Sequence, residues 1–177
     1  MKTYTGYITE LKENQVYVFG SNPVGINGNP SKGTGGAALF ALKQGWIQQG
    51  EKLDNCLSSS GKAWGLTTVT YPGKKRSKTV DEIVKGIAIL YLHTLSSPYR
   101  EFLIAYTVSN KPNLNGYSNQ EMADMFSKLQ PIPDNIIFEY EFSKLLNATS
   151  VDLYAYYTGI DNGLNSLIID DIRAHSS

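Results

Sequence analysis

The sequence lacks paired cysteines and long apolar runs. Cys56 is the only cysteine among 177 residues, so no disulfide can form within the chain, and a reducing compartment is expected. No run approaches the roughly 18 apolar residues that a membrane-spanning helix needs, and no apolar stretch typical of a signal peptide follows the first methionine. These absences predict a soluble, cytoplasmic protein without a membrane partner.

An excess of charge is also lacking, because 16 Lys and Arg residues balance 16 Asp and Glu residues. A neutral chain has no overall field that attracts nucleic acid, so a nucleic-acid partner is not expected. The basic cluster Lys74–Lys78 has four cations and no interleaved aromatic residue. We interpret it as a solvated loop, and a phosphate-binding patch is the weaker alternative.

Residues for metal binding and acid–base chemistry are scarce. Two histidines and one cysteine form no zinc-type motif, and no cofactor or metal is expected. A Ser-His-acid triad would have to use His93, inside an expected helix, or His175, near the end of the chain, so it is disfavoured. Cys56 is interpreted as a residue without a catalytic role, and a nucleophile is the weaker alternative. Whether the protein is an enzyme stays open, and no catalytic residue is predicted.

Apolar strands alternate with helical patterns along the chain. Strands are expected at Tyr4–Thr9, Val16–Asn22, Ala63–Thr70, Glu101–Val108 and Ile136–Phe138. Helices are expected over residues 36–49, 80–95, 118–129 and 139–146. This alternation predicts one domain over residues 1–177, a three-layer α/β/α fold with a mixed, mostly parallel sheet. Residues 147–177 are expected to form a C-terminal extension packed on it.

Two of the expected helices begin with a capping box, in which a hydroxyl residue is followed three residues later by glutamate. Thr79 pairs with Glu82, and Ser118 pairs with Glu121. These pairs predict where the two helices start.

Two polar, glycine-rich loops follow strands and are the candidate site: Ser21–Gly36 and Ser109–Gly116. Ligands of open α/β sheets bind beyond the carboxyl ends of the strands. Pro23–Gly36 has 14 residues, whereas such loops usually have about 2–6. Free amides at the start of the Gly36 helix are expected to attract an anion, above all phosphate. Alternatively, the glycines serve only a tight turn and close packing. No established phosphate-binding fingerprint fits the loop.

The first loop and its borders resemble a family of known proteins. Val18-Phe19-Gly20-Ser21-Asn22, the glycine-rich loop and Gly35-Gly36-Ala37-Ala38 are similar to a set of small bacterial and phage proteins related to the macrodomain. Asn115-Gly116-Tyr117, followed by a helix with Glu121 and Phe126, resembles the second loop of that set. Where those relatives show a histidine in the first loop, this chain has Ile26-Asn27-Gly28.

The resemblance implies a macrodomain-like fold and an ADP-ribose-like nucleotide ligand, bound or hydrolysed. The first loop would hold the distal ribose and a phosphate, with Asn22 near that ribose, and the second loop would approach the diphosphate. Tyr117 would stack on the ligand or cap it. The implied binding residues are Asn22, Gly33, Thr34, Gly35, Gly36, Ser109, Asn110, Gly116 and Tyr117. The alternative is a protein-interaction module that kept the fold without turnover, which twelve tyrosines and a possible homo-oligomer would suit.

Overall fold

The sheet at the centre of the protein has six strands. The computed structural model describes residues 1–109, 111–147, 151–153 and 155–156. The strands are β1 (Thr3–Tyr4), β2 (Gln15–Ser21), β3 (Cys56–Leu57), β4 (Ala63–Thr67), β5 (Glu101–Ile104) and β7 (Ile136–Glu139). Their order across the sheet is β1-β7-β5-β2-β4-β3, and only β3 runs antiparallel to its neighbour. The predicted α/β class with a mixed, mostly parallel sheet is confirmed.

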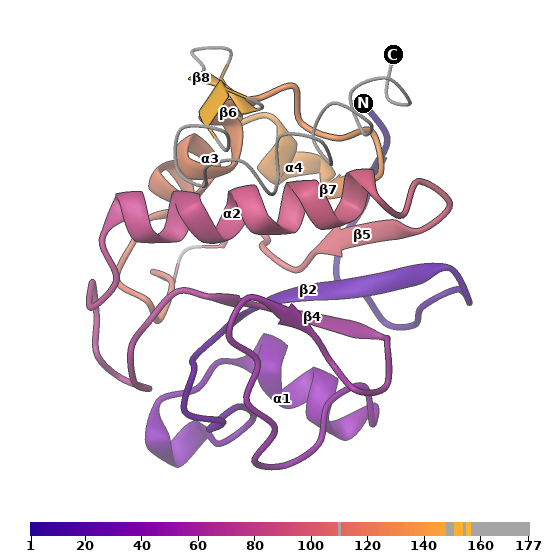
Figure 1. Ribbon diagram of the computed structural model, residues 1–177. Helices are drawn as coiled ribbons and strands as arrows, with labels where there is room; N and C mark the ends of the chain where they lie inside the picture. The colour runs from indigo at the N-terminus through magenta and orange to yellow at the C-terminus, as the bar shows by residue number, and fades with distance from the viewer. Residues whose placement is uncertain (110, 148–150, 154, 157–177) are drawn as a thin grey trace.

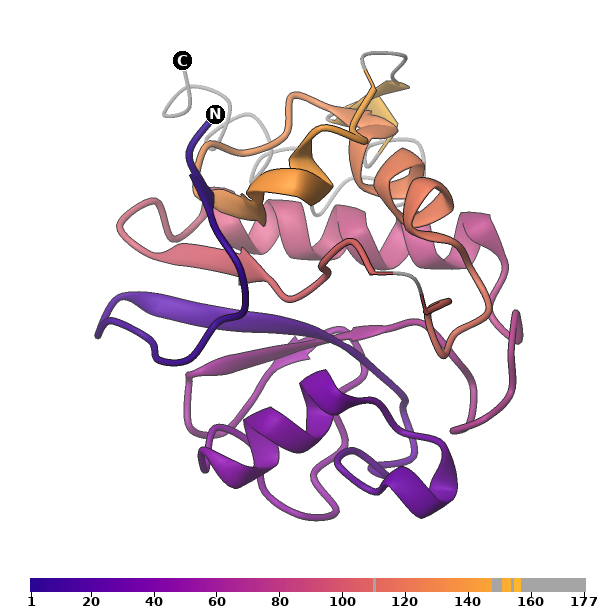
Figure 2. The ribbon, with the colours of Figure 1, turned by 180° about the vertical axis from the view of Figure 1, so that it is seen from behind.

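Helices cover both faces of this sheet. They are α1 (Gly36–Lys43), α2 (Val80–Leu95), α3 (Asn119–Ser127) and α4 (Tyr140–Ser143). Helix α1 lies on one face, whereas α2, α3 and α4 lie on the other, as two opposite views show (Figure 1, Figure 2). Each face has its own hydrophobic cluster, so the arrangement has the three layers that the sequence predicts.

Strand β2 shows why the central strands are apolar throughout. Val16 and Val18 belong to the cluster under α2, and Tyr17 and Phe19 belong to the cluster under α1. All four are at most 4% exposed. A strand covered on both faces needs apolar side chains at every position, and this explains its continuous apolar run.

The predicted end of the first helix was wrong. Helix α1 ends at Lys43 instead of residue 49. Gly45 takes a left-handed φ of 75°, and the amide of Trp46 donates to the carbonyl of Ala41. The chain therefore turns back, and the Trp46 ring packs on Phe40 at 5.6 Å between ring centroids. Gly45 ends the helix, not the Gly50 that the pattern favoured.

Other elements are shorter than expected or were missed. Strand β1 has two residues, and β3 lies where only a connection was expected. Leu129–Gln130 (β6) and Val151–Asp152 (β8) form a separate parallel pair. Most of the expected extension, residues 148–150, 154 and 157–177, lies outside the described residues. Within the described part of the chain, no helix combines the length and apolar character needed to cross a bilayer.

Candidate functional site

The carboxyl ends of β2 and β5 frame the candidate site. These strands are parallel neighbours. The chain leaves β2 toward α1 on one face of the sheet and leaves β5 toward α3 on the other (Figure 1). Such a divergence of connections opens a crevice at the strand ends, which is where open α/β sheets bind ligands. Both glycine-rich loops start at this point.

A cavity of about 470 Å³, here called the main cavity, lies between the two loops. Residues 34–38 line it from the first loop and α1, and residues 109 and 111–115 line it from the second loop. Gly20 and Thr68 contribute from the ends of β2 and β4. Among the residues that the structure describes, no Asp, Glu or His lines it, and Lys111 is its one cationic side chain. The site is therefore suited to an anion.

A smaller hollow of about 50 Å³, here called the recess, adjoins the main cavity. The two share six residues in their walls: Gly20, Thr34, Gly35, Thr68, Leu114 and Asn115. Asn22, Asn27 and other neutral residues line the rest of the recess. The recess is thus a small extension of the main cavity beside the start of α1.

An aromatic cavity of about 430 Å³ adjoins the main cavity on its other side. Its walls include Tyr4, Tyr7, Tyr17 and Phe40, and it shares Gly36, Ala37, Ala105 and Thr107 with the main cavity. The hydroxyl of Tyr4 donates to the carbonyl of Ile104 at 2.6 Å. Burial raises the pKa of Tyr4 and Tyr17, so both phenols are uncharged at neutral pH.

The start of α1 opens onto the main cavity. Gly35 is the N-cap, no described side chain caps it, and the first turn contains no acidic residue. The amide of Leu39 donates to the carbonyl of Gly35 at 3.1 Å. Helix geometry leaves the amides of the three preceding residues, 36–38, without a partner inside the helix. These amides carry partial positive charge and can bind an anion.

Asn22 shapes the first loop. It is 2% exposed. Its Nδ2 donates to the carbonyl of Ile26 at 2.6 Å and to Oδ1 of Asn27 at 3.3 Å. Its Oδ1 accepts from the amides of Val24 and Ile26, each at 3.2 Å. Asn22 lines the recess, but every polar atom of its side chain is already bonded within its own loop.

Gly33 and Thr34 hold the first loop in place. Gly33 has a φ of 89°, and a Cβ there would lie 3.0 Å from the amide nitrogen of Gly73. Only glycine permits this conformation together with such a close approach. The hydroxyl of Thr34 accepts from the amide of Asn29. Both residues lie in the wall of the recess.

The predicted residues of the second loop fall into two groups. Ser109 is exposed and lines the main cavity, and Asn110 lies outside the described residues. Gly116 and Tyr117 line none of the three cavities. Gly116 has a φ of 90°, and a Cβ there would lie 2.9 Å from Cβ of Lys75. Gly116 therefore provides a close backbone approach within the protein.

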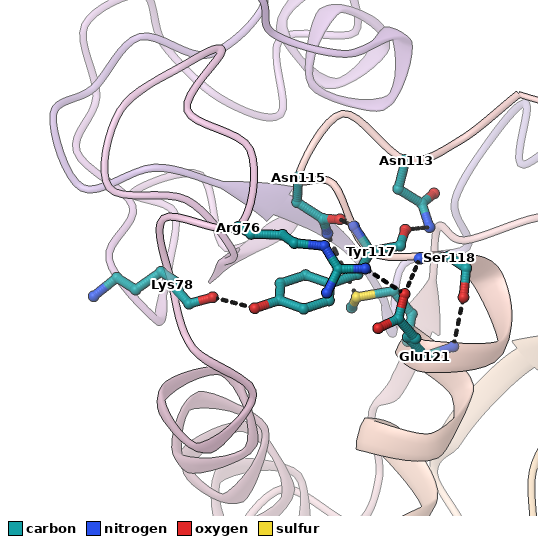
Figure 3. A network of polar contacts seen from close by, with 8 residues as sticks. Arg76, Lys78, Asn113, Asn115, Tyr117, Ser118 and Glu121 are labelled. Carbon is teal, nitrogen blue, oxygen red and sulfur yellow. Dashed lines mark hydrogen bonds and ion pairs between the residues drawn. The ribbon is translucent and has the colours of Figure 1, made fainter.

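Tyr117 is held in a network of polar contacts (Figure 3). Its ring is 4% exposed, and its hydroxyl donates to the carbonyl of Lys78 at 2.6 Å. The guanidinium of Arg76 lies 4.6 Å from the ring centroid. Tyr117 therefore joins the second loop to the basic loop, an arrangement that differs from the expected stacking on a ligand.

The same network closes the start of α3. The predicted capping box of Ser118 and Glu121 is confirmed, and Arg76 forms an ion pair with Glu121 at 2.8 Å (Figure 3). The hydrogen bond from the Ser118 amide, assisted by Arg76, lowers the pKa of Glu121. Lys78 also pairs with a carboxylate, that of Glu82 at 3.7 Å. Two cations of the basic cluster, Arg76 and Lys78, are therefore paired within the protein.

Three other titratable side chains, those of Tyr106, His93 and Cys56, have pKa values shifted by burial. Burial raises the pKa of Tyr106, in the wall of the main cavity, to about 12. His93 packs between Trp64 and Phe102, and burial followed by the charge of Arg100 lowers its pKa. Burial raises the pKa of the Cys56 thiol. Among residues 1–109, 111–147, 151–153 and 155–156, no three His, Cys, Asp or Glu side chains are grouped to hold a metal ion.

Fold and site together define an α/β protein with a cleft at the carboxyl edge of its sheet. Comparisons with protein-family models, with curated proteins and with solved structures found no match for this chain. A function for this chain must therefore be inferred from the geometry of the cleft.

Proposed function

We propose that the protein binds ADP-ribose or a related nucleotide in the cleft formed by the aromatic cavity, the main cavity and the recess. The observation that carries this proposal is the uncapped start of α1, which opens onto a cavity without carboxylates. Each of the two larger cavities lies within the range of about 300–1,000 Å³ typical of small-molecule sites. The resemblance of the two loops to macrodomain-related proteins supports the same ligand class.

The order of the cavities suits the parts of such a nucleotide. Phe40 and the neighbouring tyrosines offer an apolar, aromatic environment for a flat base. The amides of residues 36–38 offer partial positive charge for the diphosphate, and Lys111 adds a full positive charge on the opposite wall. One ligand can therefore contact an aromatic surface and an anion site at once.

The proposed activity is binding of the nucleotide without turnover. Neither a carboxylate nor an imidazole lines the main cavity among the described residues. The Tyr106 phenol has a pKa of about 12, so it stays protonated at neutral pH and is a weak candidate for a general base.

Isothermal titration calorimetry with ADP-ribose, ADP, NAD and adenosine tests the proposal. We expect saturable binding of the three diphosphate ligands. Adenosine lacks the phosphates that α1 would hold, so it should bind at least about tenfold more weakly, a difference of about 1.4 kcal/mol. Circular dichroism of the same sample shows that the protein is folded. A folded protein that binds none of the diphosphates at millimolar concentration would contradict the proposal.

A further inference from the structure

Two hydroxyl groups meet at the wall of the main cavity, those of Thr68 and Tyr106. Thr68 follows β4 and is 4% exposed, and Tyr106 follows β5 and is 9% exposed. A Cβ at Gly20 would lie 2.8 Å from the hydroxyl oxygen of Tyr106 and 3.1 Å from that of Thr68. All three residues line the main cavity. The missing side chain of Gly20 therefore leaves room for both hydroxyls beside this cavity.

The Tyr106 side chain is held in place from both ends. Its ring centroid lies 5.8 Å from that of Phe126 and 6.1 Å from that of Phe142. At the other end, Nδ2 of Asn115 donates to the phenol oxygen at 3.5 Å. Oδ1 of Asn115 accepts from the Tyr117 amide at 2.8 Å, which fixes the orientation of the Asn115 amide. The Tyr106 oxygen is thus an acceptor for Asn115, and its own proton is available for another bond.

The two hydroxyls have one proton more than their mutual contact uses. Burial raises the pKa of Tyr106, and hydrogen bonds with Thr68 and Asn115 oppose this rise, so the phenol is protonated at neutral pH. One hydroxyl proton lies between Thr68 and Tyr106, whichever of the two donates it. The second has no acceptor among the described residues. Buried polar groups are nearly always paired, so this proton requires an acceptor that enters the main cavity.

The other walls of the main cavity indicate what that acceptor is. The amides of residues 36–38 and the ammonium group of Lys111 are also donors, and no described carboxylate or imidazole lines the cavity. An anionic oxygen is an acceptor for all of these groups. A hydrogen bond from a hydroxyl to such an oxygen is about twice as strong as one between neutral groups. The free hydroxyl proton therefore favours an anionic oxygen as its acceptor.

We infer that the hydroxyl pair of Thr68 and Tyr106 is a further binding element of the cleft, which donates its free proton to a phosphate oxygen of the nucleotide. The inference rests on the proposed function and adds a binding group outside the two glycine-rich loops. The pair supplies a donor without adding charge. It makes Thr68 and Tyr106 specificity-determining residues that favour nucleotides with phosphates over nucleosides.

Titrations of the whole chain with ADP and adenosine, by calorimetry and NMR, test this role. The double variant Thr68→Val/Tyr106→Phe removes both hydroxyls together, because either one alone would still have a proton to donate. Thr70→Val/Tyr99→Phe is the matched control, since both residues are exposed and line none of the three cavities. The control should bind ADP as the wild type does. Thr68→Val/Tyr106→Phe should bind ADP about tenfold more weakly and adenosine within about twofold of the wild type.

The double variant should keep its fold, because removing both partners of a hydrogen bond leaves neither of them unpaired. Nδ2 of Asn115 keeps its 3.4 Å contact with the sulfur of Met122. A second measurement uses the unaltered protein with ¹³C-labelled tyrosine. The Cζ signal of Tyr106, identified by its loss in Tyr106→Phe, should shift with ADP and stay in place with adenosine.

The outcomes separate the two claims. Unchanged ADP binding in the double variant, equal weakening of ADP and adenosine, or a Tyr106 signal that ignores ADP would overturn the role of the hydroxyl pair while leaving the proposed function intact. A folded wild type that binds neither ADP nor ADP-ribose would overturn the proposed function and this inference with it.

Discussion

The two helices that follow the neighbouring strands β2 and β5, α1 and α3, start differently. At α3, Ser118 and Glu121 satisfy each other's amides, and Arg76 neutralises the glutamate. At α1, Gly35 offers no side chain, and no acidic residue follows in the first turn. Helix starts carry partial positive charge that is satisfied either from within the protein or from outside. Of these two starts, only that of α1 is left open to a ligand.

The two glycine-rich loops therefore have unequal roles. The first supplies the open amides and the recess. The second supplies a wall of the main cavity through residues 109 and 111–115, and Gly116 and Tyr117 tie it to the basic loop. Variants at matched positions of the two loops test this difference.

Gly116→Ala should have the largest effect on stability. A Cβ at φ 90° is strained and would lie within 3.0 Å of Lys75 and Arg76 atoms, so we expect a loss of about 1–3 kcal/mol in the free energy of unfolding. Gly36→Ala is the matched control, because a Cβ there meets nothing within 4 Å. It should leave stability unchanged or raise it by up to about 1 kcal/mol. Urea unfolding measures both.

Equal losses of stability in the two variants would contradict this division, because Gly36 would then be as constrained as Gly116. ADP affinity of the folded Gly116→Ala protein should match the wild type, since Gly116 lines no part of the cleft.

Tyr117→Phe should have a moderate effect on stability and none on ligand binding. The variant loses the 2.6 Å hydrogen bond to Lys78, at a net cost of about 0.5–1.5 kcal/mol. Tyr99→Phe is the control, because Tyr99 is an exposed tyrosine. Thermal unfolding and calorimetry with ADP-ribose measure the two quantities. If Tyr117→Phe weakened ADP-ribose binding severalfold at unchanged stability, Tyr117 would contact the ligand, as the family resemblance implies.

The smallest effect is expected from pH. Stability should depend on the protonation of His93 in the helical core, whereas ligand affinity in the cleft should not change with pH. Burial lowers the pKa of folded His93 below its ordinary value of 6.5, so the unfolded chain takes up a proton first as the pH falls. The contribution of His93 to stability is therefore complete above pH 6.5 and decreases as the pH falls below it. His93→Gln should flatten the decline measured by urea unfolding. ADP-ribose affinity should stay constant from about pH 5.5 to 7.5, since no described carboxylate or imidazole lines the main cavity. An equally steep decline in the variant would refute the assignment to His93.

Much of the fold could be predicted because its signals are local. The apolar run of β2 and the capping boxes at Thr79 and Ser118 are patterns within a few residues, and the structure confirms them. The end of α1 was missed because the pattern favoured Gly50 as the stop, whereas the chain turns at Gly45. Only the return of Trp46 onto Phe40 decides between them.

The site was harder to predict, because its decisive contacts join distant residues. Their glycine content marked the two loops as a candidate binding site, and the structure places both loops at one edge of the sheet. Nothing local shows that Arg76 would pair with Glu121 or cover the ring of Tyr117. The hydroxyl pair of Thr68 and Tyr106 was equally invisible, since the two side chains meet only after folding.

Whether the open amides of α1 bind phosphate is tested by the affinity for ADP of Gly35→Asp, compared with that of Gly35→Asn. An aspartate at the N-cap would bond the amides of α1 and add a negative charge, so stability should rise by about 0.5–1 kcal/mol. The nearest atom to a new Cβ is Cδ1 of Leu114 at 3.4 Å, an ordinary contact. If the open amides hold the phosphates, ADP binding should fall at least about tenfold in Gly35→Asp and less in Gly35→Asn. A more stable Gly35→Asp protein that binds ADP as tightly as the wild type would contradict the account.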